Sequence, residues 1–392
     1  MTADGVDDAV GDAPRPGSAD RLAPLPWRSL VLLALLGTVL GASLTLLDLG
    51  RTRESNGGLI HTGPEGPAAA LMAEDFPDEP QFRYGEHDGP MFYAVARDPW
   101  DLDRAAASLD RPRYRLQHPV FSWLAWLAHP TGTGGDGLLW TMFGVGVASM
   151  VLGGVAVGAL SHTLRGPIWL AAVLPILPGA TVSLRITVAD TLAVALLAAA
   201  LAASLRGRDG LAMALGVAAV LTKEPMILGL GGLALWRRDR AGVALVAVPV
   251  AVAAAWFAVL AASVPTSGAE VIEFGAPLVG LWRASTEIWA EGDSPYALVS
   301  VVAALVLAVV VLVRRRPDHP LWWPVAVNLA FVVLLDVTVI GLERNGTRMT
   351  LPLLVLGLVG ALAPSGTAEV PAGVVPTRRW WPRPTRRAGV AG

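Results

Sequence analysis

Long apolar runs, separated by shorter polar breaks, make up most of the chain. The first run extends from Leu30 to about Leu47, close to the roughly 20 apolar residues that a helix needs to cross a bilayer. After a polar stretch, further runs follow at about 138–160, 167–181, 187–205, 210–222, 225–236, 241–263, 296–313, 321–340 and 348–363. The pattern predicts an all-α fold, a polytopic integral membrane protein with about ten transmembrane helices.

Arginines between the runs indicate how these helices are oriented. They cluster in alternate breaks, at 161–166, 206–209, 237–240 and 314–320, and again near the C-terminus. Because positive residues favour the cytoplasmic side of a membrane, we expect both termini inside. Residues 48–118 then form a large first extracytoplasmic loop. We divide the chain into a disordered cytoplasmic tail (1–28), a transmembrane module (29–365) and an Arg/Trp/Pro-rich cytoplasmic tail (366–392).

Several apolar segments are too short or too interrupted to be simple spans. Residues 119–129 are rich in Trp and too short to cross, which favours a helix lying in the membrane interface. Pro175 and Pro178 interrupt one run, and the pair Lys223-Glu224 separates two others. Broken helices at membrane depth are tolerated where they line a cavity. The interruptions therefore predict a cavity among the helices.

Composition narrows the classes of function. The 392 residues are 54% hydrophobic and 16% charged, whereas soluble domains carry about 25% charged residues. The net charge of −2 provides no basic field for nucleic acid. The chain has no cysteine, which excludes disulfides, thiolate nucleophiles and cysteine-based metal sites. It has no Walker loop or dinucleotide-binding glycine motif, so we expect no nucleotide cofactor. An excess of Ala, Gly and Val, with a single lysine, is typical of a bacterial protein, which predicts the bacterial cytoplasmic (inner) membrane.

The first outer loop carries the densest cluster of reactive side chains. Glu86, His87 and Asp88 place two carboxylates and an imidazole in three consecutive positions. Such a cluster can bind a divalent cation, Mg²⁺ or Mn²⁺, or supply a general base. Gly85 and Gly89 flank it and equally fit an exposed acidic turn.

Other charges lie at the ends of apolar runs. Asp190 begins one run, Lys223 and Glu224 lie between two runs, and Arg348 follows the last outer turn. Asp190 also fits a helix N-cap, and Lys223-Glu224 an interfacial turn. Ionisable residues at membrane depth tend to face a cavity, and the predicted topology places these residues on the same side as Asp88. The sequence therefore predicts one outward-facing site.

Four short segments together resemble a known family. They are Asp88-Gly89-Pro90-Met91-Phe92-Tyr93-Ala94-Val95-Ala96-Arg97-Asp98-Pro99, Arg113-Tyr114-Arg115-Leu116-Gln117-His118-Pro119, Ala189-Asp190-Thr191-Leu192 and Leu221-Thr222-Lys223-Glu224-Pro225. Together they resemble the polytopic GT-C type membrane glycosyltransferases, and in particular the actinobacterial cell-envelope members, and the resemblance covers most of residues 29–363.

The resemblance implies an enzyme that takes a sugar from a polyprenyl-phosphate donor on the outer face of the membrane. The sugar passes to a hydroxyl of a glycan, lipid or protein acceptor. Asp88 is at the position of the expected catalytic base or metal ligand, with Glu86 as a second acid and Lys223 as partner of the phosphate. Arg115, His118, Asp190, Glu224 and Arg348 complete the expected substrate-binding residues. Two alternatives remain: a transporter or flippase of a lipid-linked envelope precursor, and a noncatalytic partner in envelope assembly.

Overall fold

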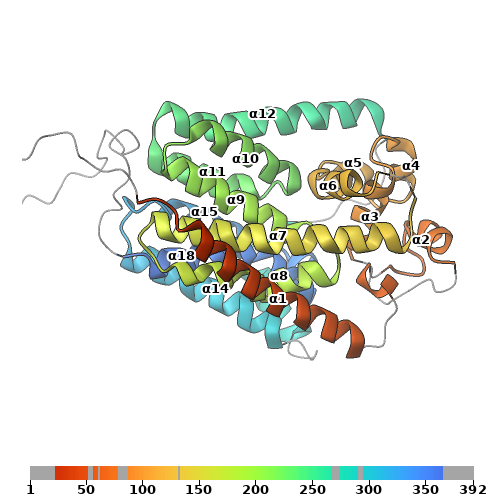
Figure 1. The fold of residues 1–392 in the computed structure, drawn as a ribbon, viewed down its shortest axis with the longest axis horizontal. Helices are drawn as coiled ribbons and strands as arrows, with labels where there is room; N and C mark the ends of the chain where they lie inside the picture. Colours follow the sequence, from red (N-terminus) through yellow and green to blue (C-terminus); the bar gives the residue numbers. More distant parts are fainter. Residues whose placement is uncertain are drawn as a thin grey trace, which may run out of the picture.

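The structure is a bundle of helices that lie roughly along one axis (Figure 1). It is a computed structural model that describes residues 23–51, 56–60, 62–77, 87–130, 133–265, 273–289 and 295–364. Within these residues there is no β-strand, and an isolated bridge joins Phe274 to Leu335. The predicted all-α class is therefore confirmed.

Four of the described helices are long and apolar enough to cross a membrane. They are α1 (Trp27–Arg51), α7 (Asp136–Thr163), α12 (Arg240–Ser263) and α14 (Pro295–Arg314). Shorter apolar helices are α9 (Asp190–Leu205), α10 (Asp209–Thr222), α11 (Met226–Arg237), α15 (Trp322–Leu334) and α18 (Leu351–Leu362). Each overlaps a predicted apolar run, but the structure does not confirm ten separate spans.

Two predicted apolar runs are not single helices. The run 167–181 consists of two 3₁₀ turns, η2 (Ile168–Ala172) and η3 (Leu174–Ile176), followed by α8 (Pro178–Arg185) after a bend of 46°. Proline lacks the backbone N–H that a continuous helix requires, and this run contains two internal prolines. The run 321–340 ends as a helix at Leu334. Asp336 then begins α16 (Val337–Ile340), because its carboxylate accepts a hydrogen bond from the Thr338 backbone N–H at 3.0 Å.

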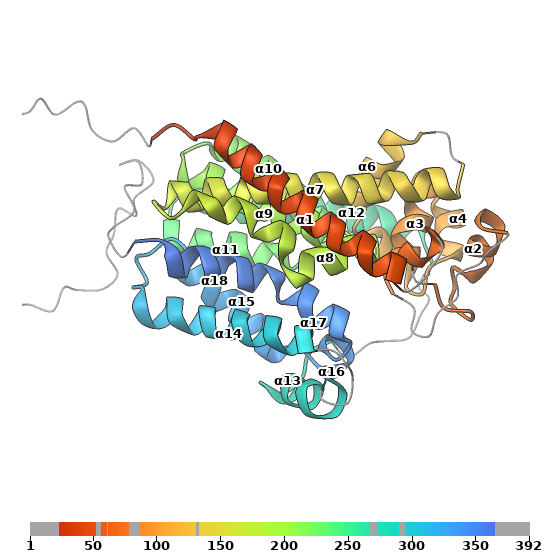
Figure 2. The same ribbon diagram turned by 60° about the horizontal axis from the view of Figure 1, so that its bottom comes forward.

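Short helices gather at one end of the bundle, away from the end where α1 begins and α18 ends (Figures 1 and 2). The first group, called the outer lobe below, comprises η1 (Asn56–Leu59), α2 (Ala69–Asp75), α3 (Gly89–Arg97), α4 (Leu102–Ala107), α5 (Pro112–Leu116) and α6 (Val120–Ala128). The second comprises α13 (Val279–Arg283), η4 (Ala284–Ile288), α16 and α17 (Glu343–Met349). Helix α6 coincides with the segment predicted to lie in the interface.

A polar clamp joins the outer lobe to the first turn of α7. The Tyr93 hydroxyl donates to Asp75 Oδ2 at 2.8 Å and accepts from the Gly135 backbone N–H at 2.5 Å. Arg97 forms an ion pair with Asp75 at 2.9 Å. Because Tyr93, Arg97 and Asp75 have little exposed side chain, the pairing offsets the desolvation of their polar groups. The clamp fixes α3, and hence the segment that carries Asp88.

Close packing of α1, α7 and η2 depends on a glycine in the middle of α7. A Cβ atom added to Gly154 would lie 2.8 Å from the Cβ of Ala34 on α1, and closer still to the carbonyl oxygen of Ala171 in η2. Small residues allow such close approach between helices in membranes. Gly144, on the same helix, would meet no atom within 4 Å. Both glycines therefore lie within the same helix, but only Gly154 is closely packed against other segments.

We predict opposite effects of alanine at these two positions. Gly144→Ala should raise the free energy of unfolding by about 0.5–1 kcal/mol, because alanine favours the helix. Gly154→Ala should lower it by about 1–3 kcal/mol, because the new methyl group has no room. The thermal unfolding midpoint in detergent, followed by tryptophan fluorescence, measures both. Stabilisation by both substitutions would contradict the packing described for α7.

Candidate functional site

The carboxylate of Asp88 lies between two guanidinium groups. Asp88 immediately precedes α3, where its oxygens receive two side chains that are distant in sequence. Arg115 Nη1, from α5, lies 2.6 Å from Asp88 Oδ1, and Arg348 Nη2, from α17, lies 2.9 Å from Asp88 Oδ2. The outer lobe and the second group of short helices therefore meet at this carboxylate.

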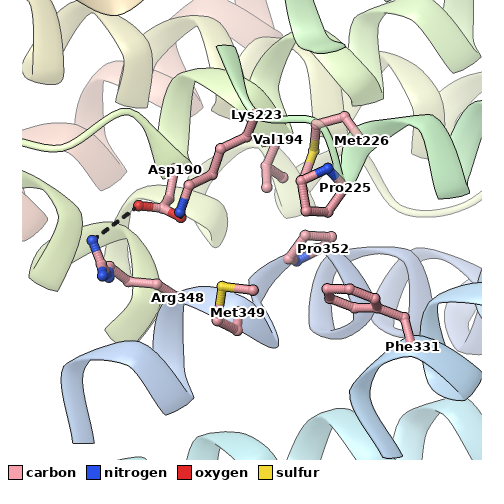
Figure 3. Close-up of a pocket in the computed structure, with 9 residues that line it drawn as sticks. All are labelled: Asp190, Val194, Lys223, Pro225, Met226, Phe331, Arg348, Met349 and Pro352. Atoms are coloured by element: carbon pink, nitrogen blue, oxygen red, sulfur yellow. Dashed lines mark hydrogen bonds and ion pairs between the residues drawn. The ribbon is translucent and has the colours of Figure 1, made fainter. Parts of the chain in front are cut away.

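Arg348 extends the ion pairs to a second carboxylate. Its Nη1 lies 3.3 Å from Asp190 Oδ2 at the start of α9, and Lys223 Nζ lies 2.6 Å from Asp190 Oδ1. Figure 3 shows Lys223 and Arg348 reaching Asp190 from two sides. We call Asp88, Arg115, Asp190, Lys223 and Arg348 the ion network. It joins three cations to two carboxylates.

Local backbone geometry explains why these side chains converge. Gly89 lies against two other segments, since an added Cβ would lie 2.5 Å from the carbonyl oxygens of both Ile60 and Ile186. Only glycine permits this approach, which holds the neighbouring Asp88 close to α8 and α9. Lys223 adopts an extended backbone (φ −158°, ψ 124°) that ends α10. The break turns its side chain towards Asp190.

The ion network is largely buried, and its positive charges favour the ionised form of its carboxylates. Arg348 is 3% exposed and Asp190 is 4% exposed. At Asp88, which lies outside the membrane-length helices, burial by itself would raise the pKa of the carboxyl. The positive charges of Arg348, Arg115 and Lys223 outweigh burial and hold the pKa of Asp88 well below its usual value. Asp88 is therefore ionised at neutral pH.

A narrow cavity adjoins the inner side of the ion network. Asp190, Lys223 and Arg348 form its charged end (Figure 3). The remaining lining is apolar and comprises Val194, Pro225, Met226, Phe331, Met349 and Pro352. Its volume is about 10 Å³, about the room that one water molecule needs. The cavity therefore combines a cationic end with an apolar wall contributed by several helices.

A second polar cluster lies around Tyr114, whose ring centroid is 5.5 Å from the guanidinium of Arg115. His118 Nε2 is in contact with Glu224 Oε2, and the His118 ring packs edge-on against Tyr114 at 5.3 Å between centroids. Arg111 lies over the Tyr114 ring at 4.2 Å from its centroid and pairs with Glu273 at 3.5 Å. These contacts connect the outer lobe with the break between α10 and α11 and with the segment that leads into α13.

Most of the predicted site residues therefore come together, and some remain apart. Asp88, Arg115, Asp190, Lys223 and Arg348 form the ion network, and His118 and Glu224 pair beside it. His87 is half-buried; burial, then the positive charges of Arg344 and Arg348, lower its pKa to about 4. It is therefore neutral at pH 7. Glu86 lies outside the described residues.

Two contacts of the ion network involve residues that the sequence did not single out. Asp110 holds Arg115 through two hydrogen bonds, at 2.7 and 2.8 Å. Asn345 Oδ1 accepts a hydrogen bond from Arg348 Nη2. Asp110 precedes the short helix α5 without a periodic pattern, so no sequence signal related it to Arg115. Asn345 and Arg348 are three positions apart on one helix, and residues at this spacing are neighbours on the helix surface. This spacing could have related the two residues from the sequence.

The described residues do not fit a divalent cation at Asp88. Within the part of the chain that the structure describes, no three His, Asp or Glu side chains are arranged to hold a metal ion. Both Asp88 oxygens already face guanidinium groups, and His87 faces the positive charges of Arg344 and Arg348. A metal held together with Glu86 stays a prediction, because that residue is not described.

Comparison with known proteins identifies no relative of this chain. The chain matches no family model, no curated protein and no solved structure. The contacts described above are therefore the observations on which the function is argued.

We predict that Asp190 stabilises the fold through its two cationic partners. Asp190→Asn leaves Lys223 and Arg348 with less compensation and should lower the free energy of unfolding by about 3–5 kcal/mol, as expected when a buried ion pair loses one partner. Adding Lys223→Met removes the uncompensated ammonium group and should restore part of the loss. Thermal unfolding in detergent measures each variant.

Asp318→Asn is the matched control for this cycle. Asp318 is 66% exposed and pairs with Arg316 at 3.9 Å, so its loss should change the free energy of unfolding by no more than about 0.5 kcal/mol. A double variant less stable than Asp190→Asn alone would show that Lys223 stabilises the fold independently of Asp190.

Proposed function

We propose that the chain is an integral membrane glycosyltransferase that moves a sugar from a polyprenyl-phosphate donor to a hydroxyl of a cell-envelope acceptor. The observation that supports this best is the juxtaposition of buried cations with an apolar cavity. Lys223 and Arg348 lie at one end of the cavity, and apolar side chains line the rest. A lipid phosphate is complementary to this arrangement, because it joins an anionic group to an apolar chain.

Two hydrogen-bond donors are suited to the phosphate. Arg348 Nε is buried and has no hydrogen-bond partner among the described residues, and such a donor favours an incoming acceptor because an unpaired buried polar group is unfavourable. Lys223 carries three N–H donors, which it can direct at phosphate oxygens. A bound phosphate then competes with Asp190 and Asp88 for these cations.

The same cations favour the chemical step. When the sugar leaves its carrier, the bond between the anomeric carbon and the phosphate oxygen breaks, and negative charge builds up on the phosphate. Fixed cations at that position stabilise the developing charge without reorganising. The acceptor hydroxyl must lose a proton as it attacks. Asp88 as the base stays a prediction from the resemblance.

The ion network is proposed to face the outside of the bacterial cytoplasmic membrane, with both termini inside. Two exposed arginines lie at the end opposite to the outer lobe: Arg314, the last residue of α14, and Arg316, in the loop to α15, which is 77% exposed. Positive residues favour the cytoplasmic side. The short helices and the ion network then lie on the outer side.

We predict that a membrane-impermeant maleimide distinguishes the two ends in intact cells. Because the chain contains no cysteine, one introduced cysteine gives an unambiguous signal. Asp103→Cys in the outer lobe should be labelled, and Asp318→Cys, equally a replaced exposed aspartate, should be labelled only after permeabilisation. The reverse pattern would place the ion network on the cytoplasmic side and contradict the proposed topology.

The activity itself is tested by sugar transfer in lipid nanodiscs, using labelled polyprenyl-phosphate sugars and extracted envelope acceptors. We expect transfer by the wild-type protein and competition by farnesyl phosphate, but not by farnesol, which lacks the phosphate. Lys223→Gln should raise the KM for the donor tenfold or more, because one phosphate contact is lost. Arg283→Gln, in an exposed ion pair with Glu287, is the matched control and should leave KM unchanged.

Failure of transfer with every donor would overturn the proposed activity. A transporter or flippase predicts movement of the lipid-linked precursor across the bilayer with the sugar still attached. A noncatalytic partner predicts neither transfer nor movement. Sugar transfer measured in nanodiscs and movement of the precursor measured across proteoliposome membranes distinguish these alternatives.

A further inference from the structure

Glu224 is a carboxylate next to the ion network but outside its cation pairs. Its predecessor Lys223 turns towards Asp190, whereas Glu224 turns towards His118 of the outer lobe. The Glu224 side chain is 45% exposed and the His118 side chain is 5% exposed. Two consecutive residues therefore place a cation at the cavity and an accessible carboxylate on the outer side.

The carboxylates of Asp88 and Glu224 differ in the side chains that contact them. Each Asp88 oxygen faces a guanidinium group, from Arg115 or Arg348. Guanidinium groups are permanently charged, so both oxygens of Asp88 are engaged by fixed cations. In the described residues, Glu224 has no Arg or Lys in an ion pair and is held by the imidazole of His118. Of the two carboxylates, Glu224 is the more accessible to a hydroxyl group.

Tyr114 connects the two carboxylates in space. Its ring packs against His118 at 5.3 Å and receives the guanidinium of Arg115 at 5.5 Å from its centroid. Burial, followed by the negative charges of Glu224 and Asp88, raises the pKa of Tyr114. Tyr114 therefore lies between the partners of the two carboxylates, since His118 contacts Glu224 and Arg115 pairs with Asp88. Glu224 therefore belongs to the same cluster of polar side chains as the ion network.

We propose that Glu224 takes the proton from the acceptor hydroxyl, that His118 positions Glu224, and that Asp88 instead holds Arg115 and Arg348 in place. This inference rests on the proposed glycosyltransferase function and assigns the base within it. His118 acts through Glu224 and is a positioning residue.

The proposed step balances without a further reactant. The acceptor oxygen forms a bond to the anomeric carbon while the bond from that carbon to the phosphate oxygen breaks. The electron pair of the broken bond leaves with the lipid phosphate, next to Lys223 and Arg348. The acceptor proton passes to a carboxylate oxygen of Glu224 and later returns to water. Sugar is transferred, and a lipid phosphate is released.

The test compares two carboxylate variants in full-length protein in nanodiscs, using whichever labelled donor the wild-type protein accepts. Glu224→Gln should lower kcat about 100-fold or more, the range of a lost general base, with the donor KM within about threefold of wild type. Asp88→Asn should instead raise the donor KM, because Arg115 and Arg348 lose the carboxylate that positions them.

Chemical rescue separates catalysis from structure. Formate fits the space left in Glu224→Ala and should restore part of kcat, whereas it should restore nothing in His118→Gln. Glu287→Gln is the matched control: Glu287 is 53% exposed in an ion pair with Arg283, so its loss should leave kcat unchanged.

Three outcomes would overturn the assignment of Glu224. The first is a Glu224→Gln variant that keeps more than a tenth of the wild-type kcat. The second is formate rescue of Asp88→Ala in place of Glu224→Ala, which would make Asp88 the base. The third is loss of activity in Glu224→Ala without rescue and with a lowered unfolding midpoint, which would make Glu224 structural. An inactive wild-type protein is a different failure, because it refutes the proposed function and the assignment together.

Discussion

One buried guanidinium group connects the segments that form the candidate site. Arg348 is in ion pairs with both Asp88 and Asp190, and so ties α17 to the start of α3 and to the start of α9. Burying a charge is unfavourable unless it is paired, so the three segments stabilise one another only when all are in place. The positions of the outer lobe, the α10–α11 break and the cavity all depend on this arrangement.

The apolar pattern predicted the helices well because lipid-facing segments need continuous apolar length. Helices α1, α7, α12 and α14 each lie over a predicted run. The interruption predicted at Pro175 and Pro178 is confirmed as a bend in the run 167–181. The pattern was wrong in the run 321–340, which ends as a helix before Asp336, whose side chain caps a new helix instead.

The residues that converge in the candidate site were largely indicated by the sequence, but their pairing was not. Charges at the ends of apolar runs indicated Asp190, Lys223 and Arg348, because such charges face a cavity. No local pattern relates Asp88 to Arg348 across 260 positions, so the central contact required the fold. Sequence spacing also grouped Asp88 with its immediate neighbours, whereas in the structure its partners come from α5 and α17.

The small volume of the cavity has a consequence for affinity. A space of about 10 Å³ does not admit a phosphate with its attached chain, so binding of the proposed lipid donor would require the walls contributed by Met226, Phe331 and Pro352 to separate. The observed dissociation constant is then the intrinsic one divided by the fraction of molecules in that open conformation. Substitutions of these apolar residues that favour the open conformation would tighten donor binding without adding a contact.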